Sequence, residues 1–194
     1  MRGCSLISRS VTTSACKNRV VIVFIQGAGR NVHDGWDRKL VDSLERELGL
    51  EVTYPLMPDE ADPHYAAWKP VLRDVIADGA ILVGHSVGGT MLLHALAEDP
   101  EIKPRALILI AAPYIGAGGW PSDELAARTH FDLNVPVVLF YGSADTTVPT
   151  AHVDLYAKAI PNATVHVLAG RDHQLNNDLS EVARAINHVC AAIV

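Results

Sequence analysis

The sequence predicts an α/β fold in which a parallel sheet is covered by helices. From Val20 onward, six apolar segments of strand length alternate with helical patterns, which is typical of right-handed strand–helix–strand crossovers. Most of these segments are continuous apolar runs, as expected of parallel strands buried on both faces. The expected strands are Val20–Ile25, Glu51–Tyr54, Ala80–Val83, Ala106–Ile110, Val137–Tyr141 and Thr164–Leu168.

Helical spacing of apolar residues predicts five helices between and after these strands. In the first of them, Leu40, Leu44 and Leu48 fall on one face, as in an amphipathic helix. Gly49 follows at the position where a helix often ends on a glycine. The expected helices lie near Trp36–Leu48, Ala66–Ala77, Val87–Glu98, Ala151–Ala159 and Leu179–Ala192.

The composition is that of one globular domain, which we place at residues 20–194. The chain has 194 residues, of which 49% are hydrophobic and 20% charged, enough for a sizeable core. Residues 1–19 contain four basic residues and no acidic one. We expect them to form a disordered N-terminal extension, although their composition also faintly resembles an organelle transit peptide.

Charge and hydropathy exclude several classes of partner. The net charge of −6, with no cluster of Lys or Arg, argues against binding to nucleic acid. The longest apolar runs are far shorter than the roughly 20 residues that a membrane span needs. The three cysteines, Cys4, Cys16 and Cys190, show neither a disulfide framework nor metal-ligand spacing. We therefore expect no metal and a reducing, cytoplasmic location, with organelle targeting as the alternative.

The segment Gly84-His85-Ser86-Val87-Gly88 has the pattern of a nucleophile elbow. It directly follows the apolar run Ala80–Val83 and leads into a helical pattern. In such a turn the serine is held in a strained backbone conformation and its hydroxyl projects from the edge of the sheet. The flanking glycines are needed because the strand and the helix pass close to each other. Ser86 is therefore the candidate nucleophile.

These residues resemble the α/β-hydrolase superfamily and, more narrowly, the small serine hydrolases related to retinoblastoma-binding protein 9. The elbow and the loop Gly142–Pro149 carry the resemblance to the superfamily. The segments Phe24–Gly29, His33–Trp36 and Met57–Asp59 carry the resemblance to the narrower group. One departure is Asp172, because the family usually has glycine immediately before its final histidine.

The resemblance implies a three-layer α/β-hydrolase fold with a six-stranded parallel sheet in the order 2-1-3-4-5-6. This order follows because residues 1–19 cannot supply the two further strands with which larger members begin. It brings the loop after the first strand against the elbow. The segment Ala111–Val135, where larger relatives insert a lid, is short, so we expect a minimal cap or none, and an open, shallow cleft.

The serine needs a base to take its proton and a carboxylate to orient that base. The superfamily places them in the chain order Ser, Asp or Glu, His. Asp145 and His173 each follow a predicted strand, so they should lie at the same sheet edge as Ser86. Asp172 is the competing acid, but adjacent side chains in an extended loop point apart, and we rank Asp145 first.

Two backbone N–H groups are expected to form an oxyanion hole. One belongs to Val87, which follows the nucleophile and opens a helix whose dipole favours negative charge. The other belongs to Ala28, between Gly27 and Gly29 in the loop after the first strand. A phosphate cradle is the alternative for this loop, but no Gly-x-Gly-x-x-Gly pattern and no Walker lysine follows.

Three aromatic residues, Trp36, Tyr114 and Trp120, are candidates to line the substrate cleft. The alternative is that they are partly buried packing residues. We expect His85 to be a packed, hydrogen-bonded residue with no catalytic role.

The sequence thus predicts a serine hydrolase without a cofactor. Its substrate would be a small-molecule or peptide-like acyl compound. The enzyme would cleave a small ester, thioester or amide of this kind through an acyl-enzyme. A non-catalytic binding protein with the same fold is the main alternative, and a lyase that uses the same triad is a second one.

Overall fold

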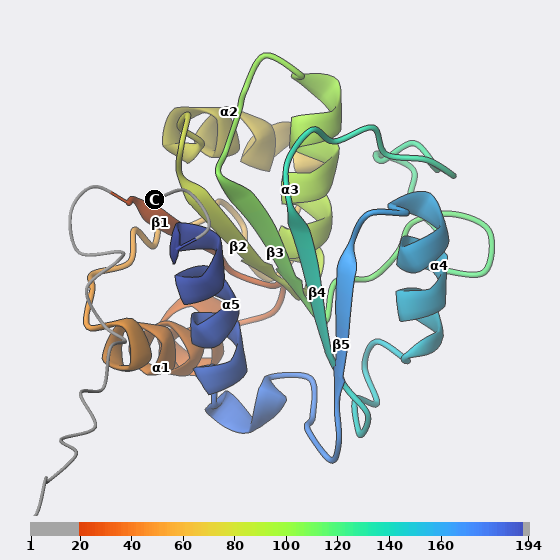
Figure 1. Cartoon of the computed structure of the whole chain (residues 1–194). Helices are drawn as coiled ribbons and strands as arrows, with labels where there is room; N and C mark the ends of the chain where they lie inside the picture. The colour runs from red at the N-terminus through yellow and green to blue at the C-terminus, as the bar shows by residue number, and fades with distance from the viewer. Residues whose placement is uncertain (1–19, 192–194) are drawn as a thin grey trace, which may run out of the picture.

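The computed structural model describes residues 20–191 and shows a parallel sheet between two layers of helices (Figure 1). Within these residues the sheet has five strands in the order β1-β2-β3-β4-β5, and each neighbouring pair is parallel. The strands are β1 (Ile22–Ile25), β2 (Ile81–His85), β3 (Ala106–Ile110), β4 (Val137–Gly142) and β5 (Thr164–Leu168).

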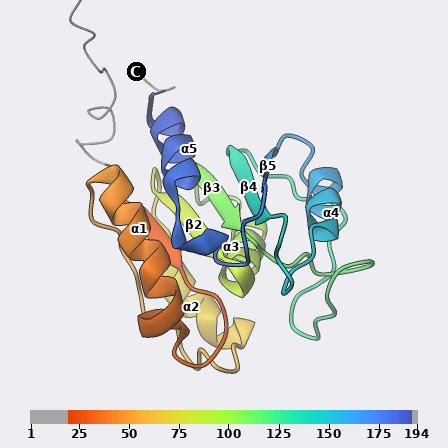
Figure 2. The same cartoon turned by 90° about the horizontal axis from the view of Figure 1, so that it is seen from below.

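Helices cover both faces of the sheet (Figure 2). The helices are α1 (Arg38–Leu48), α2 (Tyr65–Val75), α3 (Ser86–Glu98), α4 (Ala151–Ala159) and α5 (Ser180–Ala191). The apolar residues of α1 and α5 pack on one face of the sheet, and those of α2, α3 and α4 pack on the other. A π-helical turn, Val32–Asp37, precedes α1, and a short 3₁₀ turn, Leu175–Asn177, precedes α5.

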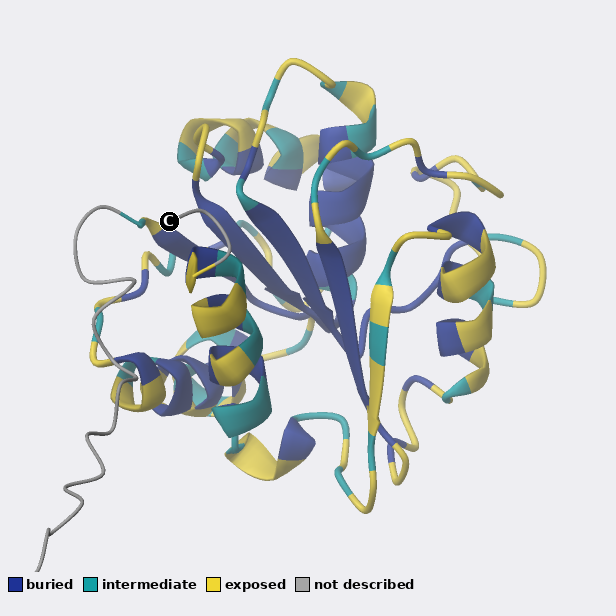
Figure 3. Cartoon of the chain, in the orientation of Figure 1, coloured by how far each residue is buried: buried dark blue, intermediate teal, exposed yellow. Residues whose placement is uncertain are grey.

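The core is centred on the four strands β1 to β4, whose residues are buried throughout (Figure 3). This confirms the expectation from their continuous apolar sequences. In contrast, β5 lies at the edge of the sheet and is largely exposed, with Val167 at 49%. The segment between β3 and β4, which lies within the described residues, contains no helix.

The sixth strand that the sequence predicts at Glu51–Tyr54 is reduced to a single bridge. Thr53 lies beside Val23 of β1, on the side away from β2. Phe24 N donates to Thr53 O at 2.9 Å, and Thr53 N donates to the carbonyl of Ile22 at 2.8 Å. The ladder does not extend further toward the C-terminus because Pro55, two residues on, has no N–H to donate.

Four other expectations have different outcomes. The prediction for residues 1–19 lies outside the described residues. Gly49 adopts a left-handed conformation (φ 64°) and donates its N–H to Glu45 O, so it ends α1 as predicted. Cys190 is disulfide-bonded, which contradicts the expectation that the cysteines form no disulfide. None of the helices described within residues 20–191 is long and apolar enough to cross a membrane.

The first turn of α3 passes very close to the end of β1. A Cβ added to Gly88 would lie 2.0 Å from the carbonyl oxygen of Gln26 and 2.8 Å from that of Ile25. A Cβ on Gly84 would lie 2.4 Å from the Cα of Gly89. Real atoms do not approach so closely, so glycine is required at Gly88, where α3 crosses the end of β1, and at Gly84, where α3 packs back on β2.

We expect Gly88→Ala to lower the free energy of unfolding by at least about 3 kcal/mol, although Ala normally stabilises a helix relative to Gly. The clashing atoms belong to the backbone and cannot rotate away. Gly79→Ala is the matched control, because Gly79 has a positive φ (75°) but nothing within 4 Å of its added Cβ. It should cost only about 1–2 kcal/mol. Urea titration measures both, and equal losses would contradict the steric explanation.

Candidate active site

Ser86 lies at the turn between β2 and α3 with a positive φ of 50°. A non-glycine residue in this left-handed region carries backbone strain. Ser86 is 7% exposed and lines a cleft of about 470 Å³ at the carboxyl end of the sheet. The strained turn that the sequence predicts is therefore present, and it presents Ser86 to a cavity.

Asp145 and His173 form a hydrogen-bonded pair beside this cleft. His173 Nδ1 lies 2.8 Å from Asp145 Oδ2, and the Asp145 side chain is fully buried. The other carboxylate oxygen, Oδ1, accepts the N–H groups of Thr147 at 2.7 Å and Val148 at 2.9 Å. Burial raises the pKa of Asp145, but the hydrogen bonds from His173 and these two amides outweigh it, and the net pKa is lowered. The carboxylate therefore stays ionised and fixes the ring of His173.

Ser86 and His173 line the same cleft. Asp145 occupies His173 Nδ1, which leaves Nε2 as the ring nitrogen able to accept a proton. No hydrogen bond among the described residues joins Ser86 Oγ to this ring. In catalytic sites such bonds are often long without substrate and tighten in the complex.

Asp172, the competing acid, is bonded elsewhere. Its Oδ1 accepts the N–H of Asn176 at 2.7 Å, and its own N–H donates to Asn176 Oδ1 at 3.0 Å. These reciprocal bonds close a tight turn after His173 and direct the Asp172 carboxylate to that turn. The exposed Asp172 thus has a local structural role, whereas Asp145 binds the His173 ring.

The loop after β1 leaves the N–H group of Ala28 available to the cleft. Gly27 N donates to Asp37 Oδ2 at 2.7 Å, and Gly29 N donates to the carbonyl of Glu60 at 2.6 Å. Ala28 lies between them and lines the cleft. Within residues 20–191, no hydrogen bond uses the N–H of Ala28 or of Val87, the second residue of α3. Both donors are therefore free to bind a ligand oxygen.

A buried ion pair, Asp37 with His85, lies behind the cleft. His85 Nδ1 is 2.9 Å from Asp37 Oδ2, the same oxygen that accepts Gly27 N. His85 Nε2 donates to the carbonyl oxygen of His173 at 3.1 Å. The pair therefore connects the loop after β1, the elbow and the loop that carries His173. His85 is packed and hydrogen-bonded, as the sequence analysis expects.

Sequence reasoning missed Asp37. It lies one turn before Leu40 and Val41 on the buried face of the first helical segment, where a carboxylate is unexpected. A buried carboxylate requires a charged or hydrogen-bonding partner. An acidic residue on the buried face of a predicted helix was therefore the sequence signal that could have identified Asp37.

Asp37 also changes the pKa of His85. Burial lowers this pKa, but the charge and hydrogen bond of Asp37 raise it more, so the net pKa is raised above 6.5.

The three candidate cleft aromatics lie in different surroundings. Trp36, 56% exposed, and Trp120 line the cleft. The structure places Tyr114 away from it: the side chain is buried, its hydroxyl donates to the carbonyl of Arg128 at 2.6 Å, and its ring packs edge-on against Tyr156. Within residues 20–191, no group of three or more His, Cys, Asp or Glu side chains could hold a metal ion.

Comparison with known proteins places this arrangement in a known fold. No family model and no curated protein matches the chain. Among solved structures, monoacylglycerol lipase of Paleococcus ferrophilus matches with a TM-score of 0.63 at 15% identity, covering 88% of this chain and 93% of that one. Mouse alpha/beta hydrolase domain-containing protein 10 matches with a TM-score of 0.64 at 20% identity, covering 92% of each chain.

A third structure, an α/β serine hydrolase without lid from Xanthomonas campestris, matches with a TM-score of 0.60 at 20% identity. The match covers 90% of this chain and 82% of that one. The fold of this chain is therefore the α/β-hydrolase fold.

We expect Ser86→Gly to be more stable than Ser86→Ala by about 1 kcal/mol, because glycine adopts a positive φ without strain and alanine does not. Both variants lack the hydroxyl, so the difference isolates the backbone. Thermal or urea unfolding of the two proteins measures it. Equal stabilities would show that the turn at Ser86 is not strained.

We expect Asp37→Asn to destabilise the protein by about 3 kcal/mol at pH 5.5, since it breaks a buried ion pair. The pKa of His85 is raised in the folded state, so its contribution is complete below its ordinary value of 6.5 and is lost as the pH rises through the folded pKa. The stability difference from the unmodified protein should therefore shrink between pH 5.5 and pH 9. A difference that does not change with pH would contradict this assignment.

Proposed function

We propose that this chain is a serine hydrolase that cleaves a small ester, thioester or amide through an acyl-enzyme. The observation that carries the proposal is the position of Ser86, which lies on a strained turn in the same cleft as His173. The His173 ring is fixed by the buried Asp145. A nucleophile, a base and a group that orients the base are the parts that acyl transfer needs.

In the first half of the proposed reaction, Ser86 Oγ bonds to the carbonyl carbon of the substrate and its proton passes to His173 Nε2. The carbonyl electron pair moves onto the oxygen, where the N–H groups of Ala28 and Val87 stabilise the negative charge. The tetrahedral intermediate then collapses. The bond to the leaving group breaks, and the leaving atom takes the proton from His173.

In the second half, a water molecule attacks the acyl carbon and gives its proton to His173. The bond between the acyl carbon and Ser86 Oγ breaks, and Oγ takes that proton back. The products are a carboxylic acid and the alcohol, thiol or amine that left first. Throughout, the Asp145 carboxylate stabilises the protonated form of His173.

The structural neighbours support a hydrolase. Those named above are a lipase, an alpha/beta hydrolase domain-containing protein and a serine hydrolase. At 15–20% identity they establish the fold, and a fold hosts many functions. Catalysis is therefore inferred from the residues of this cleft.

We expect Ser86→Ala to lose all labelling by a fluorophosphonate probe and to lower kcat for p-nitrophenyl acetate by on the order of 10⁶. Asp145→Asn should lower kcat by about 10⁴, since it disturbs the orientation of His173 and the stabilisation of its charge. Ser180→Ala, at the start of α5, is the matched control and should keep both activities.

Unchanged esterase activity in Ser86→Ala would overturn the proposal. A folded, unmodified protein that resists the probe and turns over no ester would favour the non-catalytic binding alternative. Product analysis separates hydrolysis, which consumes water, from lyase chemistry, which does not.

A further inference from the structure

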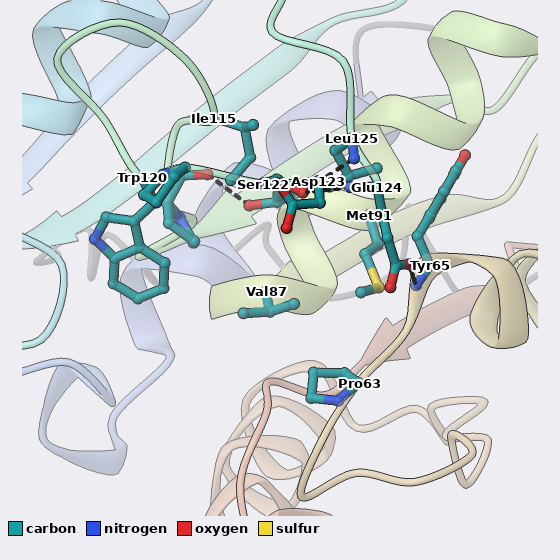
Figure 4. Close-up of a pocket in the computed structure, with 13 residues that line it drawn as sticks. Pro63, Tyr65, Val87, Met91, Ile115, Trp120, Ser122, Asp123, Glu124 and Leu125 are labelled. Carbon is teal, nitrogen blue, oxygen red and sulfur yellow. Dashed lines mark hydrogen bonds between the residues drawn. The ribbon is translucent and has the colours of Figure 1, made fainter.

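A second pocket adjoins the catalytic cleft (Figure 4). We call it the Met91 pocket. Its volume is about 300 Å³, at the lower end of the range for small-molecule sites. In Figure 4, Trp120 lies on one side and Tyr65 on the other, with Val87 and Met91 between them. Most of its lining residues come from α3 and from the loop between β3 and β4.

Two residues, Val87 and Trp120, line both the Met91 pocket and the catalytic cleft. Val87 directly follows Ser86, and its N–H is the proposed oxyanion donor. A carbonyl oxygen bound to that N–H would therefore place the substrate at the boundary between the two cavities. A group attached to the carbonyl carbon can extend from this point into either one.

The polar groups around the Met91 pocket are already engaged within the protein. Thr90 Oγ1 donates to the carbonyl of Pro113 at 2.7 Å, and Ser122 Oγ accepts the N–H of Leu125 at 3.0 Å. Glu124 uses both carboxylate oxygens, one for the His64 ring and one for Tyr65 N. These bonds leave the pocket with few polar groups to offer a ligand.

The buried wall of the pocket is apolar. Met91, Ile115 and Leu125 line the pocket and are 4%, 9% and 7% exposed. Such a surface gains stability by taking apolar groups out of water. The exposed Asp123 lies on the pocket beside Glu124, so a ligand that ends in a carboxylate would meet like charges there.

The position of His173 decides which part of the substrate enters the Met91 pocket. In acyl transfer the protonated histidine must reach the leaving atom. His173 lines the catalytic cleft and does not line the Met91 pocket. The leaving group therefore belongs in the catalytic cleft, and the acyl group belongs on the other side of Val87.

Resting on the proposed function, we infer that the Met91 pocket is the acyl-binding site and that the substrate carries an uncharged, apolar acyl chain of short to medium length. The small volume limits the chain, the apolar wall selects its chemistry, and Asp123 and Glu124 disfavour a terminal carboxylate.

The first test is a series of p-nitrophenyl esters from acetate to decanoate with the unmodified protein. We expect kcat/KM to rise by up to about fourfold for each added methylene until the pocket is filled, with a maximum between butyrate and octanoate, and then to fall. The hemiglutarate ester should react at least tenfold more slowly than the hexanoate ester. A profile that does not change with acyl length would overturn the inference.

The second test fills the pocket. Met91→Phe should lower the ratio of kcat/KM for the hexanoate ester to that for the acetate ester by at least tenfold. Leu96→Phe is the matched control: Leu96 is also buried on α3, 4% exposed, but it does not line the pocket. It should keep the ratio of the unmodified protein. If Met91→Phe does not fold, Ile115→Phe on the loop provides the same test.

The results separate this inference from the proposed function. Labelling at Ser86 and turnover of acetate, combined with equal chain-length profiles in the Met91→Phe and Leu96→Phe proteins, would overturn the acyl site and leave the hydrolase in place. Absence of both labelling and turnover would overturn the hydrolase itself and the acyl site with it.

Discussion

One buried carboxylate, that of Asp37, connects the parts of the candidate site. Its Oδ2 accepts the N–H of Gly27 and lies 2.9 Å from the ring of His85, which in turn donates to the carbonyl oxygen of His173. The loop after β1, the turn after β2 and the loop after β5 are far apart in the sequence. Because a buried charge needs its hydrogen-bonding partners, Asp37 and His85 together link these three loops.

The second constraint is the close crossing of α3 over the end of β1. It requires the absence of a side chain at Gly88 and holds Ser86 at a φ of 50°. The same crossing brings the free N–H of Val87 near the loop that contains Ala28. The strain at one residue is therefore part of the arrangement that presents both a hydroxyl and two amide donors to the cleft.

Much of this architecture follows from local sequence patterns. The strands β1 to β4 are mainly apolar and buried, and Asp145 and His173 could be placed together because each follows a predicted strand by a few residues. Features that depend on tertiary contacts could not be predicted. The burial of Tyr114, whose hydroxyl donates to the carbonyl of Arg128, depends on such contacts, and so does the reduction of the sixth strand to a single bridge. The position of Asp37 on a buried helix face could have marked it as unusual, but its partners, Gly27 and His85, become visible only in the structure.

The exposed edge strand β5 has a consequence for how the protein would lose function. An edge strand has one hydrogen-bonded neighbour, and segments with few buried contacts open at lower free energy than the core. His173 follows β5 by only five residues. Local opening of β5 would move the His173 ring away from Asp145 and Ser86 while β1 to β4 remain folded. On heating, the proposed activity would therefore be lost before the sheet unfolds.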